Sequence, residues 1–349
     1  MIKNFFLQFL SGLYKVLAGL QQWLFQKGLL KTYTVPVPVI SVGNLTVGGT
    51  GKTPFTDWLV KKILVRYSSE KVLNLAIVVR SYKASLKQPA LVDVHQSHAA
   101  ATFGDEAVLL ASLNPQIKVY SGPCKWKTAQ WAVQQGASAI LLDDGFQHRR
   151  LHRDLDLVML DATENINNYN LLPAGRARES FHSVSRAHLV LLNKVNLAKP
   201  DDVIKIEQKL NAFFDPQKVV KLGYFVRELY SLSSDKKINI NTQKGKTAFL
   251  FCALARPEIF EKSLSENMQI HPRSLRFADH YFYTAKDLQN IFKEFTQSGA
   301  QLLITTAKDA VKIRSLLTPQ SLEVWVAQLN LEVFSHVEVL YEKLDDLLV

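Results

Sequence analysis

The chain has 349 residues, 47% of them hydrophobic, which excludes a largely disordered protein and predicts one large or two medium-sized globular domains. Its formal net charge of +11 favours an anionic partner such as a nucleotide, a phospholipid headgroup, a phosphorylated sugar or a nucleic acid. The two cysteines, Cys124 and Cys252, lie far apart in the sequence, which excludes a disulfide framework and a zinc site and fits a reducing compartment.

The first predicted element is an amphipathic helix within residues 1–32. Apolar residues such as Phe9, Leu13 and Leu17 recur at helical spacing, but polar residues interrupt them before the roughly 18 to 20 apolar residues of a membrane-spanning helix are reached. The segment also lacks a cleavage site of the signal-peptide type. Two interpretations stay open: the helix packs on the protein's own core, or it lies in a membrane interface with Trp23 at headgroup level.

Short apolar runs then alternate with helical segments, a pattern that predicts a mostly parallel α/β sheet with helices on both faces. The predicted strands are residues 35–42, 73–79, 117–120, 139–142, 155–160 and 188–192, and the predicted helices are residues 54–66, 106–113 and 128–135. We expect a main domain over residues 33–230.

Lysines and polar residues dominate residues 231–246, where we expect a linker or a hairpin. Strands are predicted beyond it at residues 247–252, 302–305 and 322–326, and helices at residues 257–265 and 285–298. Residues 231–349 are therefore expected to form a smaller C-terminal α/β subdomain.

A glycine-rich segment, GNLTVGGTGKTP at residues 43–54, follows the first predicted strand and leads into a helix. This context is typical of a phosphate-binding loop, and it predicts a sheet of the P-loop NTPase type. We expect Lys52 to reach the β and γ phosphates of ATP and Thr53 to offer its hydroxyl to Mg²⁺. Thr46 stands where the usual pattern has its first glycine. The expected nucleotide contacts are Gly48, Gly49, Thr50, Gly51, Lys52 and Thr53.

Two adjacent carboxylates, Asp143 and Asp144, follow the predicted strand at residues 139–142. Such a pair at the end of a strand is costly unless a cation compensates it. We therefore infer that Mg²⁺ binds here, with a solvated acidic turn as the alternative.

The run DDGFQHRRLHRDLDLV, which begins at Asp143, together with GNLTVGGTGKTP resembles the tetraacyldisaccharide 4'-kinase family of lipid A biosynthesis. Further matching segments are FGDE at residues 103–106, LLPAG at residues 171–175 with Arg178-Glu179 after it, Asp279-His280, and TTAKDAVK at residues 305–312. The resemblance implies a phosphotransferase that moves the γ-phosphoryl group of ATP, with Mg²⁺, to the 4'-hydroxyl of tetraacyldisaccharide 1-phosphate, forming lipid IVA. It also implies that the smaller subdomain completes the active-site cleft.

The same resemblance implies an acid-base pair. Asp105 would accept the proton of the sugar hydroxyl, with His280 adjusting its protonation and Asp279 supporting the histidine. From the residues alone, Asp105 could equally cap the helix predicted at residues 106–113, and His280, which stands among aromatic residues, could be a packed core histidine.

The charge-bearing residues are assigned in the same way. Arg178 would share the phosphate charge with Lys52, and Asp144 would lie near the γ-phosphate. The resemblance places three side chains near Mg²⁺, directly or through water: Asp143, Gln147 and Glu179.

Some positions depart from the family or stay open. Lys125 replaces an arginine, which keeps the charge but loses bidentate phosphate geometry, and Ser81 replaces a glycine after Arg80, which leaves the role of Arg80 open. A basic cluster could bind the substrate 1-phosphate or pair with Asp154 and Asp156. Its members are His148, Arg149, Arg150 and Arg153.

A disaccharide with four acyl chains does not leave the bilayer, so the enzyme must approach the membrane surface. We expect a monomer, peripheral or monotopic on the cytoplasmic face of the bacterial inner membrane, with no nucleic acid as partner. No basic stripe with interleaved aromatic residues supports nucleic-acid binding.

Two other nucleotide-binding classes share short motifs with the chain. Chromosome-partitioning ATPases have a similar GGTGKT segment but carry a lysine where Val47 stands. A GTPase would explain Asn193-Lys194-Val195-Asn196 after a strand, but guanine recognition needs an aspartate in place of Asn196.

Overall fold

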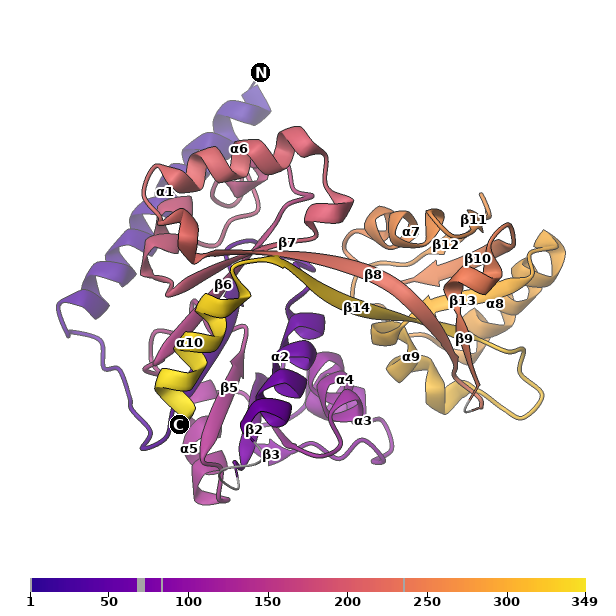
Figure 1. Cartoon of the computed structure of the whole chain (residues 1–349), viewed down its shortest axis with the longest axis horizontal. Helices are drawn as coiled ribbons and strands as arrows, with labels where there is room; N and C mark the ends of the chain where they lie inside the picture. The colour runs from indigo at the N-terminus through magenta and orange to yellow at the C-terminus, as the bar shows by residue number, and fades with distance from the viewer. Residues whose placement is uncertain (1, 68–72, 83, 235) are drawn as a thin grey trace.

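The computed structural model of the chain describes all residues except 1, 68–72, 83 and 235, and only the backbone of residues 2–6. The described part forms a larger and a smaller lobe that share one continuous mixed sheet (Figure 1). Most strand pairs in this sheet are parallel.

The larger lobe is built on parallel strands whose residues are almost all buried. In spatial order they are β4 (Lys118–Gly122), β2 (Leu75–Arg80), β5 (Ala139–Asp143), β1 (Val39–Asn44), β6 (Leu155–Asp161) and β7 (Leu189–Asn193), with the short antiparallel β3 (Ala90–Leu91) at the edge. Continuous apolar runs form such strands because both faces of the sheet are covered. β1 lies between β5 and β6, so the loop that follows β1 lies beside the carboxyl ends of both neighbours.

Helices cover both faces of this sheet. The helices on one face are α2 (Lys52–Tyr67), α3 (Ala99–Phe103) and α4 (Asp105–Leu113), and those on the other are α5 (Lys125–Gln134) and α6 (Pro200–Asn211). Phe55, Leu59 and Leu110 are buried on the first side, and Ala129 and Ile206 on the second. The predicted α/β fold with helices on both faces is confirmed.

The smaller lobe has its own strands, helices and core. Its strands are β10 (Thr247–Cys252), β11 (Gln269–Ile270), β12 (Leu275–Arg276), β13 (Leu302–Thr306) and β14 (Trp325–Ser335), and its helices are α7 (Pro257–Ser265), α8 (Ala285–Ser298) and α9 (Ala307–Ile313). The bounds of β10, α7 and α8 are those predicted from the sequence. Thr284 and Asp287 form a reciprocal capping box that fixes the start of α8.

Two long strands connect the lobes. β8 (Val219–Ser231) pairs in parallel with β7 where it begins and then runs antiparallel to β14. The sequence analysis missed β8, and it placed a strand at residues 322–326 where β14 begins only at Trp325. Both strands include partly exposed residues, a weaker signal than a continuous buried run. The segment expected as a linker or hairpin contains β9 (Lys237–Asn239), which pairs antiparallel with β8.

The C-terminal helix α10 (Val337–Leu348) returns to the larger lobe. Leu340 and Leu344 are fully buried in the same core as the α2 residues. Residues 337–348 therefore pack with the larger lobe, whereas the sequence analysis put them in the smaller subdomain. The division of the chain near residue 230 remains a prediction for the other segments.

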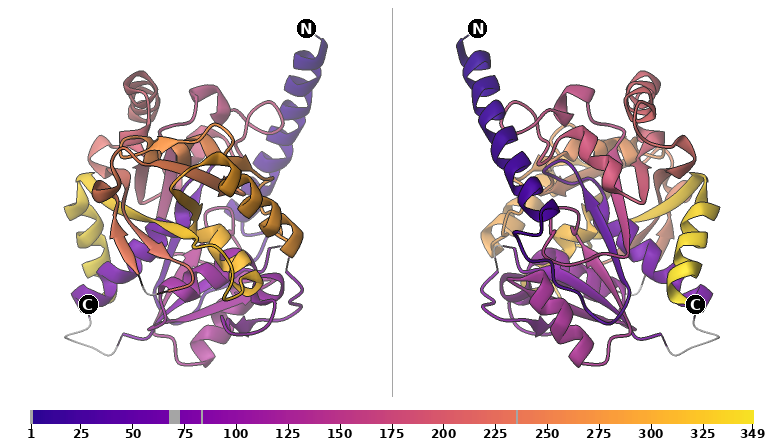
Figure 2. Two further views of the ribbon diagram at one scale, coloured as in Figure 1. Left: turned by 90° about the vertical axis from the view of Figure 1, so that its right-hand side faces the viewer. Right: turned by 90° about the vertical axis from the view of Figure 1, so that its left-hand side faces the viewer.

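The N-terminal helix α1 (Ile2–Gln26) extends away from the body of the larger lobe (Figure 2). One face, which includes Leu10, Tyr14 and Ala18, is partly buried, and the other face is exposed. Among the described residues, no helix combines the length and the apolar content needed to cross a membrane.

Candidate active site

A cavity of about 1000 Å³ opens between the two lobes. The loop after β1 and the carboxyl end of β5 line it from the larger lobe, and Arg256, His280 and Lys308 line it from the smaller lobe. Ligands of open parallel sheets bind at this edge, so the cavity has the position expected of an active site.

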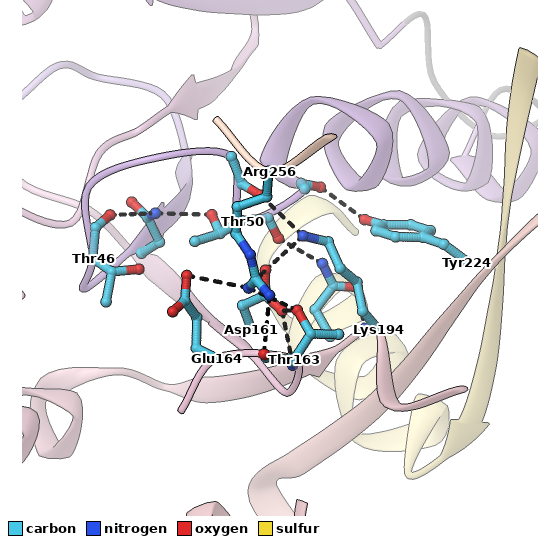
Figure 3. A network of polar contacts seen from close by, with 12 residues as sticks. Thr46, Thr50, Asp161, Thr163, Glu164, Lys194, Tyr224 and Arg256 are labelled. Atoms are coloured by element: carbon cyan, nitrogen blue, oxygen red, sulfur yellow. Dashed lines mark hydrogen bonds and ion pairs between the residues drawn. The ribbon is translucent and has the colours of Figure 1, made fainter. Parts of the chain in front are cut away.

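The glycine-rich loop lines the cavity, and neighbouring side chains donate hydrogen bonds to its carbonyl groups. Asn193 donates a 2.6 Å hydrogen bond to the Thr50 carbonyl, and Lys194 donates one of 2.9 Å to the Gly49 carbonyl (Figure 3). The Tyr224 hydroxyl donates to the Gly51 carbonyl at 2.7 Å. These contacts occupy carbonyl groups and not the N–H groups that would bind phosphate.

Gly51 is required by both backbone and packing. Its φ of 88° lies in the left-handed region, and an added Cβ would stand 2.5 Å from the Asn193 amide nitrogen. All six residues predicted to contact the nucleotide, from Gly48 to Thr53, line the cavity. Asn44, which belongs to the glycine-rich segment but was given no role, donates 2.8 Å hydrogen bonds to the Thr46 carbonyl and the Thr50 hydroxyl and so shapes the loop.

Two cations converge on Asp144. Both terminal nitrogens of Arg178 contact its carboxylate, at 3.0 and 2.8 Å, and the Lys52 ammonium lies 3.4 Å from Oδ1. Burial alone would raise the pKa of Asp144, but Lys52 and Arg178 outweigh burial and hold that pKa well below its usual value. The predicted association of Lys52, Asp144 and Arg178 at one place is therefore present.

Asp143 is almost completely buried. The Thr56 hydroxyl donates to its carboxylate at 3.4 Å. Burial, together with the negative charge of Glu106, raises the pKa of Asp143 to about 7. Such a carboxylate gains most from a nearby cation.

The residues near Asp143 fit a Mg²⁺ ion that shares its ligands with a nucleotide. Thr53 and Glu106 line the same cavity and offer further oxygen ligands. No group of three or more His, Cys, Asp or Glu side chains suited to a metal occurs in the described part of the chain. Phosphate oxygens and water would therefore have to complete the coordination, as is usual for Mg²⁺.

Asp105 and His280 form a hydrogen bond between the two lobes, 2.9 Å from Oδ2 to Nδ1. His280 lines the cavity, whereas Asp105 lies behind it and is not among the described residues that line the cavity. Asp105 is the first residue of α4, and its other carboxylate oxygen accepts a 3.0 Å hydrogen bond from the Glu106 N–H group. Lys312 and Lys308 lie 3.7 and 4.0 Å from the carboxylate. Burial would raise the pKa of Asp105, but His280 and the two lysines lower it to about 2.

The geometry does not fit the alternative roles of Asp105 as a helix cap and of His280 as a core histidine. The helix cap is Gly104 and makes no side-chain hydrogen bond, so Asp105 is not the cap residue. His280 lines the cavity with its side chain 22% exposed, which does not fit a packed core histidine. Asp279 lies 3.9 Å from His280, beyond hydrogen-bond distance, and Lys308 contacts both residues at 3.3 and 3.4 Å.

Two residues expected near Mg²⁺ do not reach the cavity. Gln147 donates a 2.9 Å hydrogen bond to the Asn44 carbonyl, and Glu179 forms ion pairs with Arg149 at 2.8 Å and Arg186 at 3.0 Å. Neither belongs to the described residues that line the cavity. Burial raises the pKa of Glu179, and the positive charge of Arg149 is the largest effect that opposes this rise.

Two members of the basic cluster after Asp144 form ion pairs within the protein itself. Arg153 binds Asp156 at 2.9 Å, and Arg149 binds Glu179. Lys125 donates to the backbone carbonyl groups of both Asp143 and Asp144, so it supports the acidic pair from behind. The structure thus supports internal pairing for Arg149 and Arg153.

A network of charged residues that sequence reasoning missed joins the lobes beside the loop (Figure 3). Arg256, just before α7, lies 3.2 Å from the Glu164 carboxylate and donates to the Thr163 hydroxyl at 2.8 Å. Lys194 lies 2.5 Å from the Asp161 carboxylate. Asp161 and Lys194 each follow a predicted strand, but nothing in their spacing indicates Arg256 as a partner.

Comparison with known proteins gives consistent results over nearly the whole chain. The model of the LpxK family, tetraacyldisaccharide-1-P 4'-kinase, matches residues 3–349. The tetraacyldisaccharide 4'-kinase of Bdellovibrio bacteriovorus is 44% identical over 93% of this chain and 94% of its own length, and that of Desulfotalea psychrophila is 35% identical over 88% of both. The crystal structure of LpxK from Aquifex aeolicus in complex with ATP superimposes with a TM-score of 0.75 at 26% identity and covers 100% of both chains.

Proposed function

The chain belongs to the tetraacyldisaccharide-1-P 4'-kinase family, and we propose that it performs the family's reaction in the cavity between its lobes. In that reaction ATP donates its γ-phosphoryl group to the 4'-hydroxyl of tetraacyldisaccharide 1-phosphate, and lipid IVA and ADP are the products. One observation carries the assignment of the site: His280, which lines the same cavity as the phosphate loop, is hydrogen-bonded to Asp105, 175 residues away in the sequence. The partitioning-ATPase and GTPase interpretations are excluded by the family match.

The loop and the two cations position the phosphates. The backbone N–H groups from Gly48 to Thr53 and the start of α2 receive the phosphate oxygens. Lys52 and Arg178, which Asp144 orients, neutralise the charge on the transferring group. Phosphoryl transfer depends mainly on such positioning and charge stabilisation.

Thr53 and Asp143 would hold Mg²⁺, together with phosphate oxygens and water. When bound, Mg²⁺ neutralises charge on the β and γ phosphates. Glu106, whose charge raises the pKa of Asp143, lines the same cavity and is a further ligand candidate. Gln147 and Glu179 are left out of this set because their side chains are engaged elsewhere.

Asp105 accepts the proton of the 4'-hydroxyl as the oxygen bonds to the γ-phosphorus and the bond from that phosphorus to the leaving oxygen of ADP breaks. With a pKa of about 2, Asp105 is a carboxylate at neutral pH and so is available as an acceptor. It is also a weak base, which suits a loose transition state in which the proton leaves late. His280, hydrogen-bonded to the carboxylate, stabilises the charge and can share the proton.

The helix α1 is proposed to lie on the surface of the membrane. Its exposed face carries Phe9, Leu13, Val16, Leu17 and Leu20, each more than half exposed. The acyl chains of the substrate remain in a bilayer, and the chain's net charge of +11 favours an anionic leaflet. We therefore propose peripheral attachment to the cytoplasmic face of the bacterial inner membrane, by a monomer.

The test is transfer of label from γ-³²P-ATP to purified tetraacyldisaccharide 1-phosphate in detergent micelles. Wild type is compared with Lys52→Ala and Asp105→Ala, and with Lys62→Ala as a control lysine on the exposed side of α2. We expect labelled lipid with wild type and Lys62→Ala, and at least about a hundredfold less with the two site variants. Hydrolysis of ATP by wild type without labelled lipid would refute the proposal.

A further inference from the structure

The helix α1 is hydrogen-bonded to the segment that carries Arg178. The Tyr14 hydroxyl donates a 2.9 Å hydrogen bond to the backbone carbonyl of Arg178, and the Ser11 hydroxyl donates one of 2.9 Å to the Leu171 carbonyl. The side chain of the same Arg178 binds Asp144 beside the phosphate loop. A single residue therefore links the N-terminal helix to the nucleotide site.

Residues 176–178 are also paired with the phosphate loop itself. The Arg178 N–H group donates to the Leu45 carbonyl and the Val47 N–H group donates to the Arg176 carbonyl, both at 2.8 Å. Thr46 and Ala177 form an isolated antiparallel bridge between these two hydrogen bonds. The segment 176–178 thus lies between α1 on one side and the entrance of the phosphate loop on the other.

The two faces of α1 have different surroundings. Ser11, Tyr14 and Ala18 are partly buried against the larger lobe, whereas Leu13 and Leu17 are more than half exposed on the other side. A lipid surface in contact with the exposed face would hold the helix on one side. The hydrogen bonds of Ser11 and Tyr14 hold it on the other side. Contacts with the membrane and hydrogen bonds with the Arg178 segment would therefore together determine where the helix lies.

We propose that Tyr14 is a positioning residue of the nucleotide site, and that through it α1 couples attachment to an anionic lipid surface with ATP binding. By linkage, a surface that stabilises the seated helix tightens ATP binding, and ATP strengthens attachment by the same factor. The inference rests on the proposed function only for its use of the nucleotide site. Its tests measure nucleotide affinity without any acceptor lipid, so the inference and the kinase assignment can fail separately.

The first test is the affinity of the full chain for a fluorescent ATP analogue in solution with Mg²⁺. Tyr14→Phe removes only the hydroxyl, and we expect about threefold to tenfold weaker binding, the range for loss of one such hydrogen bond. Tyr341→Phe is the matched control, because that ring packs on Arg66, in α2, away from the cavity. Equal affinity of Tyr14→Phe and wild type would overturn the proposal.

A double-mutant cycle separates positioning from general loosening of the fold. If Tyr14 acts through Arg178, then Tyr14→Phe has little further effect on affinity in an Arg178→Ala background. If the two losses multiply, Tyr14 acts elsewhere and the proposal is wrong. Thermal unfolding of each variant accompanies the cycle, so that a misfolded variant is recognised and replaced by Tyr14→Leu, which also lacks the hydroxyl.

The second test adds vesicles of phosphatidylglycerol and phosphatidylethanolamine, which contain no acceptor for phosphate. We expect the vesicles to tighten binding of the ATP analogue by wild type severalfold and to lose this effect with Tyr14→Phe. Leu13→Gln with Leu17→Gln should weaken attachment to the vesicles while leaving the affinity in vesicle-free solution unchanged. Vesicles that bind wild type without changing its nucleotide affinity would overturn the coupling.

Discussion

His280 Nδ1 lies 2.9 Å from Asp105 Oδ2, although the histidine belongs to the smaller lobe and the aspartate begins α4 of the larger one. Both residues are held in a fixed place: His280 has a φ of 62°, and Asp105 accepts a backbone hydrogen bond from Glu106. A proton acceptor assembled from two lobes requires that the lobes be close together. Activity should therefore depend on the histidine as well as on the aspartate.

We predict that His280→Asn lowers kcat by about a hundredfold, because general acid-base pairs contribute factors of this order. Asparagine tolerates the left-handed backbone of this position, so the change removes the ring without straining the chain. The control is His98→Asn, since His98 is also left-handed, with a φ of 57°, but is exposed. Steady-state kinetics with labelled ATP measure both. A kcat for His280→Asn within twofold of wild type would contradict the role of the pair.

The low pKa of Asp105 predicts a contribution to stability that depends on pH. The pKa falls from an ordinary value of 3.8 to about 2, so the folded chain favours the carboxylate. A lowered pKa stabilises the fold above pH 3.8, and this stabilisation is lost as the pH falls towards 2. The difference corresponds to about 2 kcal/mol.

Asp105→Asn cannot ionise and should lack this dependence. We expect the free energy of unfolding of wild type, relative to that of Asp105→Asn, to fall by about 2 kcal/mol between pH 5 and pH 2. Urea denaturation at several pH values, followed by circular dichroism, measures it. A relative stability that stays constant or rises over this interval would show that His280, Lys308 and Lys312 do not hold the carboxylate in its charged form.

The part of the site that lies at the ends of neighbouring parallel strands could be predicted from the sequence. The loop after β1 and Asp143 at the end of β5 were expected together because the carboxyl ends of parallel strands share one edge. Arg178 and His280 came from family resemblance, since no spacing rule links them to that edge. Gln147 and Glu179 do not line the cavity, because they already bind Asn44, Arg149 and Arg186, and a sequence does not show such contacts. Their place near Mg²⁺ stays a prediction.

The helix α10 shows the same limit for the fold. Leu340 and Leu344 recur at helical spacing, which indicates a helix. The pattern does not indicate the lobe on which this helix packs. The choice depends on a matching apolar surface in the core of the larger lobe, which exists only after the sheet has formed. Linear position alone placed residues 337–348 with the smaller subdomain, and packing places them with the larger lobe.

The placement of α10 leads to a prediction for stability. Leu344→Ala should lower the free energy of unfolding of the larger lobe by about 2–5 kcal/mol, because the side chain is fully buried. Val349→Ala is the control, since Val349 is 71% exposed. Hydrogen exchange of amides in β1 and β6, compared with those in β10 and β13, shows which lobe is affected. Faster exchange confined to β10 and β13 would contradict the assignment of α10 to the larger lobe.

The network around Arg256 predicts how the lobes hold their positions. Arg256→Met keeps much of the side-chain volume but removes the cation from Glu164 and Asp161, which are 4% and 1% exposed. Each acid retains one other cation, Arg176 for Glu164 and Lys194 for Asp161, so we expect a loss of about 2–3 kcal/mol rather than complete unfolding. Because Lys194 also binds the Gly49 carbonyl of the phosphate loop, affinity for ATP should fall as well.

The control for Arg256→Met is Arg227→Met, which breaks an exposed ion pair with Glu332 and should cost less than about 1 kcal/mol. Urea denaturation gives the stabilities, and binding of a fluorescent ATP analogue gives the affinities. If Arg256→Met costs no more than Arg227→Met and binds the analogue as wild type does, the inter-lobe ion pairs do not hold the phosphate loop. If stability falls while affinity is kept, Arg256 joins the lobes, and Asp161 and Lys194 support the loop without it.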